Sequence, residues 1–265
     1  MLEVRNISKT FLPGTVNERK ALDRISFELQ NGEFVTLIGS NGAGKSTLLG
    51  AIAGQFPVDC GRIRLDDEDI TALPEHRRSR FIGRLFQDPL SGTSPGLTIE
   101  ENLALVYLQG KQGKGHFSRI GGEDIKLFRE RLSGLGMGLE DRMKQPVGLL
   151  SGGQRQALTL LLATLHPPKL LMLDEHTAAL DPGSADRVMR LTQDIAKNGG
   201  ITCLMVTHNM QQALDVGSRT FIMAGGRIAA DISGKEREGL TVEGLTEMFR
   251  AAAGSEFAND RMLLY

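Results

Sequence analysis

The chain has few cysteines, no long hydrophobic run and almost no net charge. Its two cysteines, Cys60 and Cys203, are far apart and no signal-like apolar stretch follows Met1, which excludes a disulfide scaffold and predicts a reducing, cytoplasmic compartment. The longest apolar run, residues 158–165, is far below the roughly 20 residues that a membrane-spanning helix requires. With 31 basic and 32 acidic residues, the net charge of −1 gives no reason to expect bulk binding to nucleic acid.

The remaining composition is that of an ordinary globular protein. Forty per cent of the residues are hydrophobic and 24% are charged, which excludes a disordered or collagen-like chain. A length of 265 residues allows one large domain or two small ones. Glycine makes up 32 of the 265 residues, more than the usual share of about 7%. The glycines cluster where the backbone must approach another group closely.

The order of the apolar patterns predicts an α/β fold. Two alternating segments at the start are typical of antiparallel strands, and residues 34–38 are apolar on both faces, like a central parallel strand. Later strands and helices alternate, which indicates a mostly parallel sheet with helices on both faces. The expected strands cover residues 2–7, 25–29, 34–38, 61–65, 81–86, 170–173, 201–206, 221–224 and 227–232, and the expected helices 46–53, 74–79, 98–108, 123–135, 151–166, 182–197, 210–216 and a last one from 241.

This pattern predicts one main domain with an insertion. We expect the domain to span residues 1–235, with a helical subdomain at about 88–150 inserted in the α/β core, and residues 236–265 to form a helical tail. Two helical patterns of the insertion are separated by a basic, glycine-rich segment at 110–122, which predicts a mobile loop of unassigned role.

A P-loop pattern joins the strand at 34–38 to the next helix. Residues 39–46 read Gly-Ser-Asn-Gly-Ala-Gly-Lys-Ser, so backbone N–H groups can converge on phosphate oxygens at the positive end of the helix dipole. Lys45 adds a charge near the β- and γ-phosphates, Ser46 a hydroxyl for Mg²⁺ and Thr47 a hydroxyl for the α-phosphate. The expected contacts are Gly39, Ser40, Asn41, Gly42, Ala43, Gly44, Lys45, Ser46 and Thr47.

Two acids and a histidine follow later buried strands. Asp174 and Glu175 end the apolar strand at 170–173, at the sheet edge where ligands bind in open α/β folds. We expect Asp174 to hold Mg²⁺ through its water shell and Glu175 to accept the proton of a water that attacks the γ-phosphate. His208 follows the strand at 201–206 and can donate a hydrogen bond to the γ-phosphate.

A further motif indicates the family. Residues 150–154 read Leu-Ser-Gly-Gly-Gln and open a helix with a serine cap and exposed backbone N–H groups, which bind anions. Together with the motifs above, over roughly residues 2–232, the chain resembles the ATP-binding-cassette ATPases, whose signature is LSGGQ. The resemblance implies ATP hydrolysis with Mg²⁺, Walker A at 39–47 and Walker B at 170–174.

The resemblance also implies further roles. Gln87 corresponds to the Q-loop glutamine, which touches Mg²⁺ or the lytic water and links to a membrane partner, and His208 to the switch histidine. Asp181 belongs to the D-loop at the dimer interface. Phe11 lies where the family stacks an aromatic ring on adenine, although an edge-strand phenylalanine can equally pack on the core. The signature residues Ser151, Gly152, Gly153 and Gln154 are expected to bind the γ-phosphate of a second copy.

The chain departs from the family pattern at two places. His176 stands where proline usually follows the catalytic glutamate, and it either hydrogen-bonds near Glu175 or fills the proline's space. Residues 155–161 lack the usual arginine-rich stretch, a substitution that we interpret as packing.

The resemblance leaves several proteins open. If the chain is the separate ATPase subunit of a transporter, it should have one cassette and no membrane segment, as the sequence does. An ATPase that acts on DNA or ribosomes should instead have a long coiled coil or two cassettes. A P-loop kinase or GTPase leaves residues 150–154 unexplained. Residues 144–148 lack the acidic segment of many exporters, so a bacterial importer is favoured over an exporter, with a pattern similar to ATPases of uptake systems with poorly defined cargo.

The importer interpretation implies a set of partners. These are integral membrane permease subunits, a second copy of the chain in a head-to-tail dimer, and an extracytoplasmic substrate-binding protein, with no nucleic acid. The chain would then lie on the cytoplasmic face of the inner membrane, attached through the permease.

Overall fold

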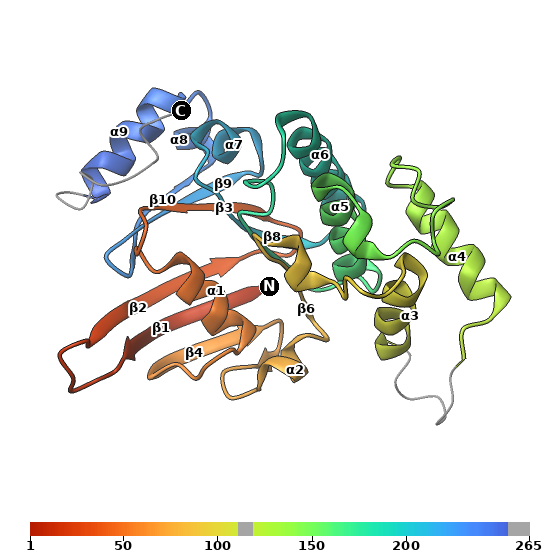
Figure 1. Cartoon of the computed structure of the whole chain (residues 1–265). Helices are drawn as coiled ribbons and strands as arrows, with labels where there is room; N and C mark the ends of the chain where they lie inside the picture. The colour runs from red at the N-terminus through yellow and green to blue at the C-terminus, as the bar shows by residue number, and fades with distance from the viewer. Residues whose placement is uncertain (111–118, 254–265) are drawn as a thin grey trace.

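The computed structural model describes residues 1–110 and 119–253, whose strands form two sheets (Figure 1). The smaller sheet is antiparallel, with the strand order β2-β1-β4-β5. The larger has the order β10-β9-β3-β8-β7-β6 and is parallel except for the β9–β10 hairpin. The predicted α/β class, with an antiparallel N-terminal part and a mostly parallel core sheet, is confirmed.

Most predicted elements are present with bounds within a few residues, but β1 extends four residues further and β2 begins six residues earlier than predicted. The strands are β1 (Leu2–Phe11), β2 (Arg19–Leu29), β3 (Phe34–Gly39), β4 (Cys60–Leu65), β5 (Glu68–Asp69), β6 (Ile82–Leu85), β7 (Leu170–Asp174), β8 (Thr202–Val206), β9 (Arg219–Ala224) and β10 (Arg227–Ser233). The helices are α1 (Lys45–Ala53), α2 (Glu75–Arg78), α3 (Ile99–Gly110), α4 (Gly122–Ser133), α5 (Gly152–Thr164), α6 (Pro182–Gly199), α7 (Met210–Asp215), α8 (Gly234–Arg237) and α9 (Val242–Ala253), with 3₁₀ turns η1 (Pro89–Gly92) and η2 (Val147–Leu149).

Helix α1 is buried between the two sheets. Its residue Ile52 belongs to one apolar cluster that includes side chains from β1, β2 and β4 of the small sheet and β3, β7 and β8 of the large one. Because strand side chains alternate, Met172 of β7 faces α1, whereas Leu171 and Leu173 pack in a second cluster with α5 and α6. Each fully buried leucine contributes about 1.5–3 kcal/mol, so the core holds the two sheets and α1 together.

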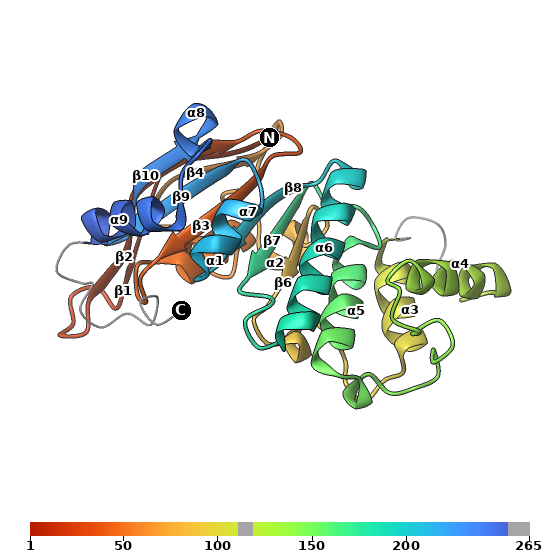
Figure 2. The ribbon, with the colours of Figure 1, turned by 90° about the horizontal axis from the view of Figure 1, so that it is seen from above.

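The predicted helical insertion is present. Helices α3 and α4 lie beyond α5, on the side away from the antiparallel sheet (Figures 1 and 2). Phe128 and Leu132 of α4 share an apolar cluster with Ala157 and Leu158 of α5, which anchors the insertion to the main domain. The predicted loop at 110–122 falls mostly on residues 111–118, which lie outside the described part of the chain.

The end of the described chain returns to the main sheet. Leu245 and Phe249 of α9 are buried against Ile38 of β3 and Ile222 of β9. Among residues 1–110 and 119–253, no helix is both long enough and apolar enough to cross a membrane. The domain bounds at 88–150, 1–235 and 236–265 stay predictions.

A buried arginine fixes the end of α1. Arg78 is 2% exposed, and its guanidinium donates hydrogen bonds to the carbonyl oxygens of Ala51 and Ile52, both at 2.8 Å, and of Leu73 at 2.7 Å and Thr71 at 2.9 Å. A cation at a helix C-terminus also stabilises the helix dipole. Arg78 therefore holds the far end of the helix that begins with Lys45.

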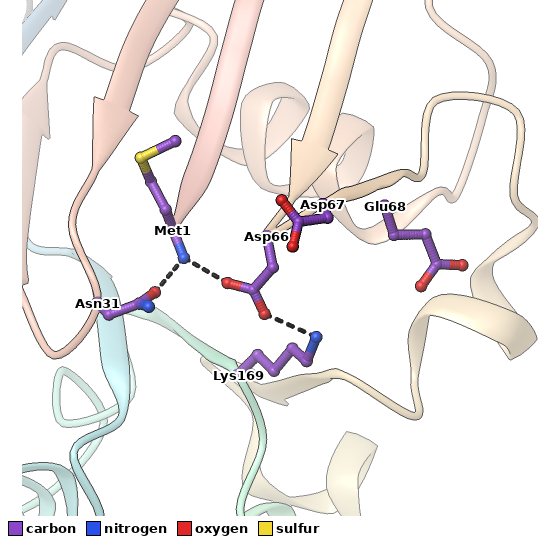
Figure 3. A pocket seen from close by; sticks show the side chains of 6 residues that line it. All are labelled: Met1, Asn31, Asp66, Asp67, Glu68 and Lys169. Atoms are coloured by element: carbon purple, nitrogen blue, oxygen red, sulfur yellow. Dashed lines mark hydrogen bonds and ion pairs between the residues drawn. The ribbon is translucent and has the colours of Figure 1, made fainter.

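Ion pairs join the two sheets at one edge. The amino group of Met1 lies 2.6 Å from Asp66, which follows β4, and Lys169, just before β7, lies 2.6 Å from the other carboxylate oxygen of Asp66 (Figure 3). The Met1 amino group also contacts the side chain of Asn31. Both cations lower the pKa of Asp66, with the hydrogen bond from Lys169 contributing most. This contact is a structural tie between the sheets.

Candidate functional site

The predicted site residues converge at the carboxyl edge of the large sheet. β3 leads into the P-loop, β8 is followed by His208, β7 ends at Asp174 and β6 is followed by Gln87, and these four strands are neighbours in the order β3-β8-β7-β6. Parallel strands bring their carboxyl ends to one edge, which explains why residues far apart in sequence meet there.

The P-loop is packed too closely for larger residues. A Cβ atom on Gly39 would lie 2.5 Å from the carbonyl oxygen of Met223, and one on Gly44, whose φ is 104°, 2.5 Å from that of Ala21. Lys45 is 6% exposed and donates hydrogen bonds to the carbonyl oxygens of Gly39 at 2.6 Å and Ser40 at 3.0 Å. The ammonium group thus lies inside the curve of the loop.

A cavity of 260 Å³ opens over the P-loop. The predicted adenine-stacking residue Phe11 lines it, and the ring also makes an edge contact with Phe56, at 5.3 Å between centroids. Both readings of Phe11 therefore have a structural basis. The cavity is lined by Phe11, Arg19, Ala21, Asn41, Gly42, Gly44, Lys45, Ser46, Thr47 and Glu175.

Glu175 and His208 form a close pair beside the P-loop. Nε2 of His208 lies 2.5 Å from Oε1 of Glu175, and the φ angle of Glu175 is 48°, in a region that few non-glycine residues adopt. Burial raises the pKa of the Glu175 carboxyl, but the hydrogen bond from His208 and the charges of His208 and Lys45 outweigh it, so the pKa is lowered. Glu175 is therefore held as a carboxylate, the form that can accept a proton.

A second cavity of 890 Å³ joins the other polar residues of the edge. Asn41, Ser46, Gln87, Glu175 and His208 line it together with residues of α7 and the start of α9. Asp174 lies at the base of this edge, where burial raises the pKa of its carboxyl and Arg84 opposes the increase. No cluster of three or more His, Cys, Asp or Glu residues suited to a metal occurs in the described ranges 1–110 and 119–253.

The signature residues lie apart from these cavities. Ser151, Gly152, Gly153 and Gln154 line neither cavity. Ser151 caps α5 by accepting a hydrogen bond from the backbone of Gln154, at 3.3 Å, and a Cβ atom on Gly153 would lie 2.7 Å from the Ser184 hydroxyl. Asp181 caps α6 through the Ser184 backbone at 3.0 Å. The fold of one chain thus gathers the P-loop, Glu175 and His208, but not the signature.

His176 is buried against α6 and also lines the 890 Å³ cavity. It is 2% exposed, and Nε2 lies 3.2 Å from the hydroxyl of Thr192 on α6. That hydroxyl donates its hydrogen to the Val188 carbonyl at 2.8 Å, so it accepts from an Nε2–H of a neutral imidazole. Of the two interpretations of His176, the structure supports packing.

The buried position of His176 predicts a pH dependence of stability. Burial lowers the pKa of His176 from 6.5 to about 4, so between these values the unfolded chain binds more protons and stability is lost as the pH falls. We expect the unfolding free energy of the native protein to fall by about 2 kcal/mol more than that of His176→Gln between pH 7 and pH 5, as measured by urea denaturation.

Two further readouts complete this experiment. His76 is exposed on α2, so His76→Gln should follow the native curve. The pH dependence of ATP hydrolysis above pH 6.5 should be the same for His176→Gln and the native protein, because His176 is neutral there. A stability difference that does not change with pH would contradict the assignment of a buried, neutral imidazole.

Two arginines at the site were not among the predicted residues. Arg19, opposite Phe11 in the β1–β2 register, donates a hydrogen bond to the Gly42 carbonyl at 2.8 Å and lines the smaller cavity. Arg84 of β6 lies 3.9 Å from Asp174. No sequence signal marks Arg19, but Arg84 is a charge within an otherwise apolar strand and could have been noticed.

This combination of features defines an ATP-binding-cassette ATPase. The features are a P-loop after β3, paired acids at the end of β7, a histidine after β8 and a serine-capped signature helix. The ABC transporter family matches residues 22–178, and the chain belongs to that family. It is an ATPase and binds ATP or ADP.

Named relatives agree with this class. The chain is 42% identical over 253 residues, 95% of its length and 100% of the relative's, to the tyrosine transport ATP-binding protein of Clostridioides difficile (strain R20291). It is 34% identical over 227 residues to the putrescine transport ATP-binding protein PotG of Escherichia coli (strain K12), covering 86% of this chain but only 55% of PotG. It is 31% identical over 236 residues to the spermidine/putrescine import ATP-binding protein PotA of Shigella dysenteriae serotype 1 (strain Sd197), covering 89% of this chain and 58% of PotA.

Solved cassette structures have the same fold. A dimeric post-hydrolysis state of the cassette MJ0796 bound to ADP and Pi aligns with a TM-score of 0.75 at 27% identity, covering 88% of this chain and 98% of that one. The ADP conformation of the cassette MJ1267 aligns with a TM-score of 0.76 at 28% identity, covering 94% and 98%.

Proposed function

We propose that this chain is the ATP-hydrolysing subunit of a bacterial ABC importer and drives a separate membrane permease through ATP-dependent dimer closure. The observation that carries the proposal is the convergence of Lys45, Glu175 and His208 at the P-loop while Ser151–Gln154 lie apart. One chain then holds only half of each ATP site, and a second copy must supply the signature.

The positions of the side chains support a chemical role for each of these residues. The P-loop amides and Lys45 bind the phosphates, and Glu175, held as a carboxylate, takes the proton of the attacking water. His208 lies 2.5 Å from Glu175, so it can orient that carboxylate and donate to the γ-phosphate once ATP is bound. Phe11 provides an aromatic face for adenine at the cavity wall.

The donor set at the edge suits Mg²⁺. The Asp174 carboxylate, the Ser46 hydroxyl and the Gln87 amide oxygen are hard ligands, and Mg²⁺ in nucleotide sites takes few protein ligands beside the phosphates. Ser46 and Gln87 line the 890 Å³ cavity together with Glu175. Bound there, Mg²⁺ would neutralise charge that develops on the transferred phosphoryl group.

The exposed signature supports a head-to-tail dimer arrangement. The N-terminus of α5 presents backbone N–H groups and a partial positive charge, and Ser151 and Gly152 are exposed. We infer that two copies close head to tail around two ATP molecules, each signature binding the γ-phosphate held by the other P-loop. Asp181, exposed at the start of α6, would lie at that interface.

Import is favoured by the relatives. Their names refer to transport of tyrosine and putrescine and to spermidine/putrescine import, all small organic solutes. We infer uptake of a solute of this class through permease subunits and an extracytoplasmic binding protein, with this chain at the cytoplasmic face of the inner membrane. An exporter subunit is the second candidate, because the site itself is common to both directions.

The proposal is tested by mapping which part of the chain contacts the permease. Leu90, beside the Q-loop, is 40% exposed, and Arg190 of α6 is also exposed. Cys60 is exposed and Cys203 buried, so single cysteines at position 90 or 190 can be placed in a Cys60→Ser background. In membranes that carry the complete transporter, we expect crosslinks to a permease from position 90 at least about tenfold above position 190, since the insertion should face the membrane. Preferential crosslinking from position 190 would refute this docking.

A further inference from the structure

Arg84 is a buried charge at the edge of the nucleotide site. Its side chain is 13% exposed, and Nε and Nη1 are buried without a hydrogen-bond partner. In the parallel register it lies opposite Met172, so it faces α1 on the same side of the sheet as Asp174, two residues further along β7. Buried polar groups are normally hydrogen-bonded, so this arginine requires an explanation.

Among the described residues, Asp174 is the acidic group within ion-pair distance of Arg84. Nη2 of Arg84 lies 3.9 Å from Oδ2 of Asp174, within the range of an ion pair but too far for a hydrogen bond. Glu75 of α2 adds a weaker attraction, and the guanidinium stacks on the Phe86 ring, 4.6 Å from its centroid. The pair therefore balances charge without fixing the carboxylate, which stays free to turn toward another cation.

That geometry matters because Asp174 interacts electrostatically with Lys45, Glu175 and His208, beside the proposed site for a highly charged anion. Without a metal ion, an unbalanced carboxylate beside the P-loop would repel the triphosphate. With Mg²⁺ between them, the repulsion is removed and a second nearby cation is no longer needed. An arginine held 3.9 Å from Asp174 by charge alone can balance the carboxylate in the metal-free site, and it does not block the binding of Mg²⁺.

We propose that Arg84 is a positioning residue that supplies the countercharge of Asp174 when the nucleotide site holds no Mg²⁺, so that the site can bind ATP without the metal. The inference rests on the proposed function, since it takes Asp174 to be the carboxylate beside the triphosphate. Stacking on Phe86 then keeps the guanidinium in place in both states.

The experiment compares the affinity for ATP with and without Mg²⁺ in the full chain. Isothermal titration calorimetry with ATP in EDTA and in excess Mg²⁺ gives the two dissociation constants. We expect Arg84→Met to weaken ATP binding about tenfold in EDTA, which is the scale of coupling between two charges. In excess Mg²⁺ the loss should be less than about twofold. Arg84→Lys should remain close to the native protein in both conditions.

A double variant separates charge compensation from packing. In Arg84→Met with Asp174→Asn, the uncompensated carboxylate is gone, so affinity in EDTA should return to within about threefold of the native value. Removal of the remote pair Arg129–Asp141 of the helical insertion, 3.3 Å apart, should change neither constant. If Arg84→Met does not fold, Arg84→Gln, which keeps polar atoms in place, provides the same comparison.

The outcomes are distinct. Unchanged affinity of Arg84→Met in EDTA, or an equal loss with and without Mg²⁺ that Asp174→Asn does not restore, would overturn the role of Arg84. Loss of ATP binding in Lys45→Ala in the same titrations would show that the site assignment holds independently of Arg84. If Lys45→Ala both bound and hydrolysed ATP like the native protein, the proposed site itself would be wrong.

Discussion

Lys45→Ala should reduce ATP hydrolysis at least about 100-fold. The ammonium group lies inside the P-loop, 2.6 Å from the Gly39 carbonyl and 3.0 Å from that of Ser40, where phosphate oxygens are expected to bind. Its removal takes away a preorganised charge opposite the charge that develops on the γ-phosphate, and one such donor is typically worth about 10²–10³ in rate. Phosphate release at saturating ATP and Mg²⁺ measures the effect.

The matched control for this variant is Lys126→Ala. Lys126 lies on α4 with its side chain 80% exposed, so its loss changes the net charge equally without touching the P-loop. Its rate of hydrolysis should equal the native rate. Undiminished hydrolysis by Lys45→Ala would mean that residues 39–47 are not the nucleotide site.

Glu175→Gln should abolish turnover and trap a dimer. The amide keeps the size of the carboxylate and can still accept the hydrogen bond from His208, but it cannot take a proton from water. We expect hydrolysis to fall by about 10²–10⁴-fold. With saturating ATP the variant should sediment as a dimer, because the γ-phosphate that bridges P-loop and signature persists, whereas with ADP or without nucleotide it should be largely monomeric.

Two comparisons make this result specific. Glu123→Gln, at a side chain 96% exposed on α4, should hydrolyse ATP normally and should not accumulate as a dimer. Ser151→Arg should block closure, because it places a bulky cation at the exposed cap of α5. A Glu175→Gln protein that stays monomeric in ATP, or a Ser151→Arg protein with intact turnover, would exclude the shared site.

Local patterns in the sequence were sufficient for most elements. β7 follows from an apolar run bounded by Pro167-Pro168 and by Asp174, and α5 from the serine cap of its signature, so both appear as expected. The two-residue strand β5 and the short helix α8 were not predicted, because two to four residues carry no periodicity. The sequence also did not predict which strands pair when they are far apart along the chain. The placement of β4 beside β1 depends on the turn geometry and burial of the assembled small sheet.

For the site, the sequence by itself determined which residues are candidates to hold phosphate, because P-loop chemistry depends on a short run of small residues, a lysine and the start of a helix. Only the tertiary structure decided which side chains share a cavity. The strand order β3-β8-β7-β6 brings His208 within 2.5 Å of Glu175 and leaves the signature apart, and the β6–β7 register places Arg84 3.9 Å from Asp174. His176 was ambiguous for the same reason: its role depends on Thr192 of α6, a neighbour that only helix packing supplies. A short motif carries its chemistry within a few consecutive residues, whereas charge balance, burial and orientation arise between segments that meet only after folding.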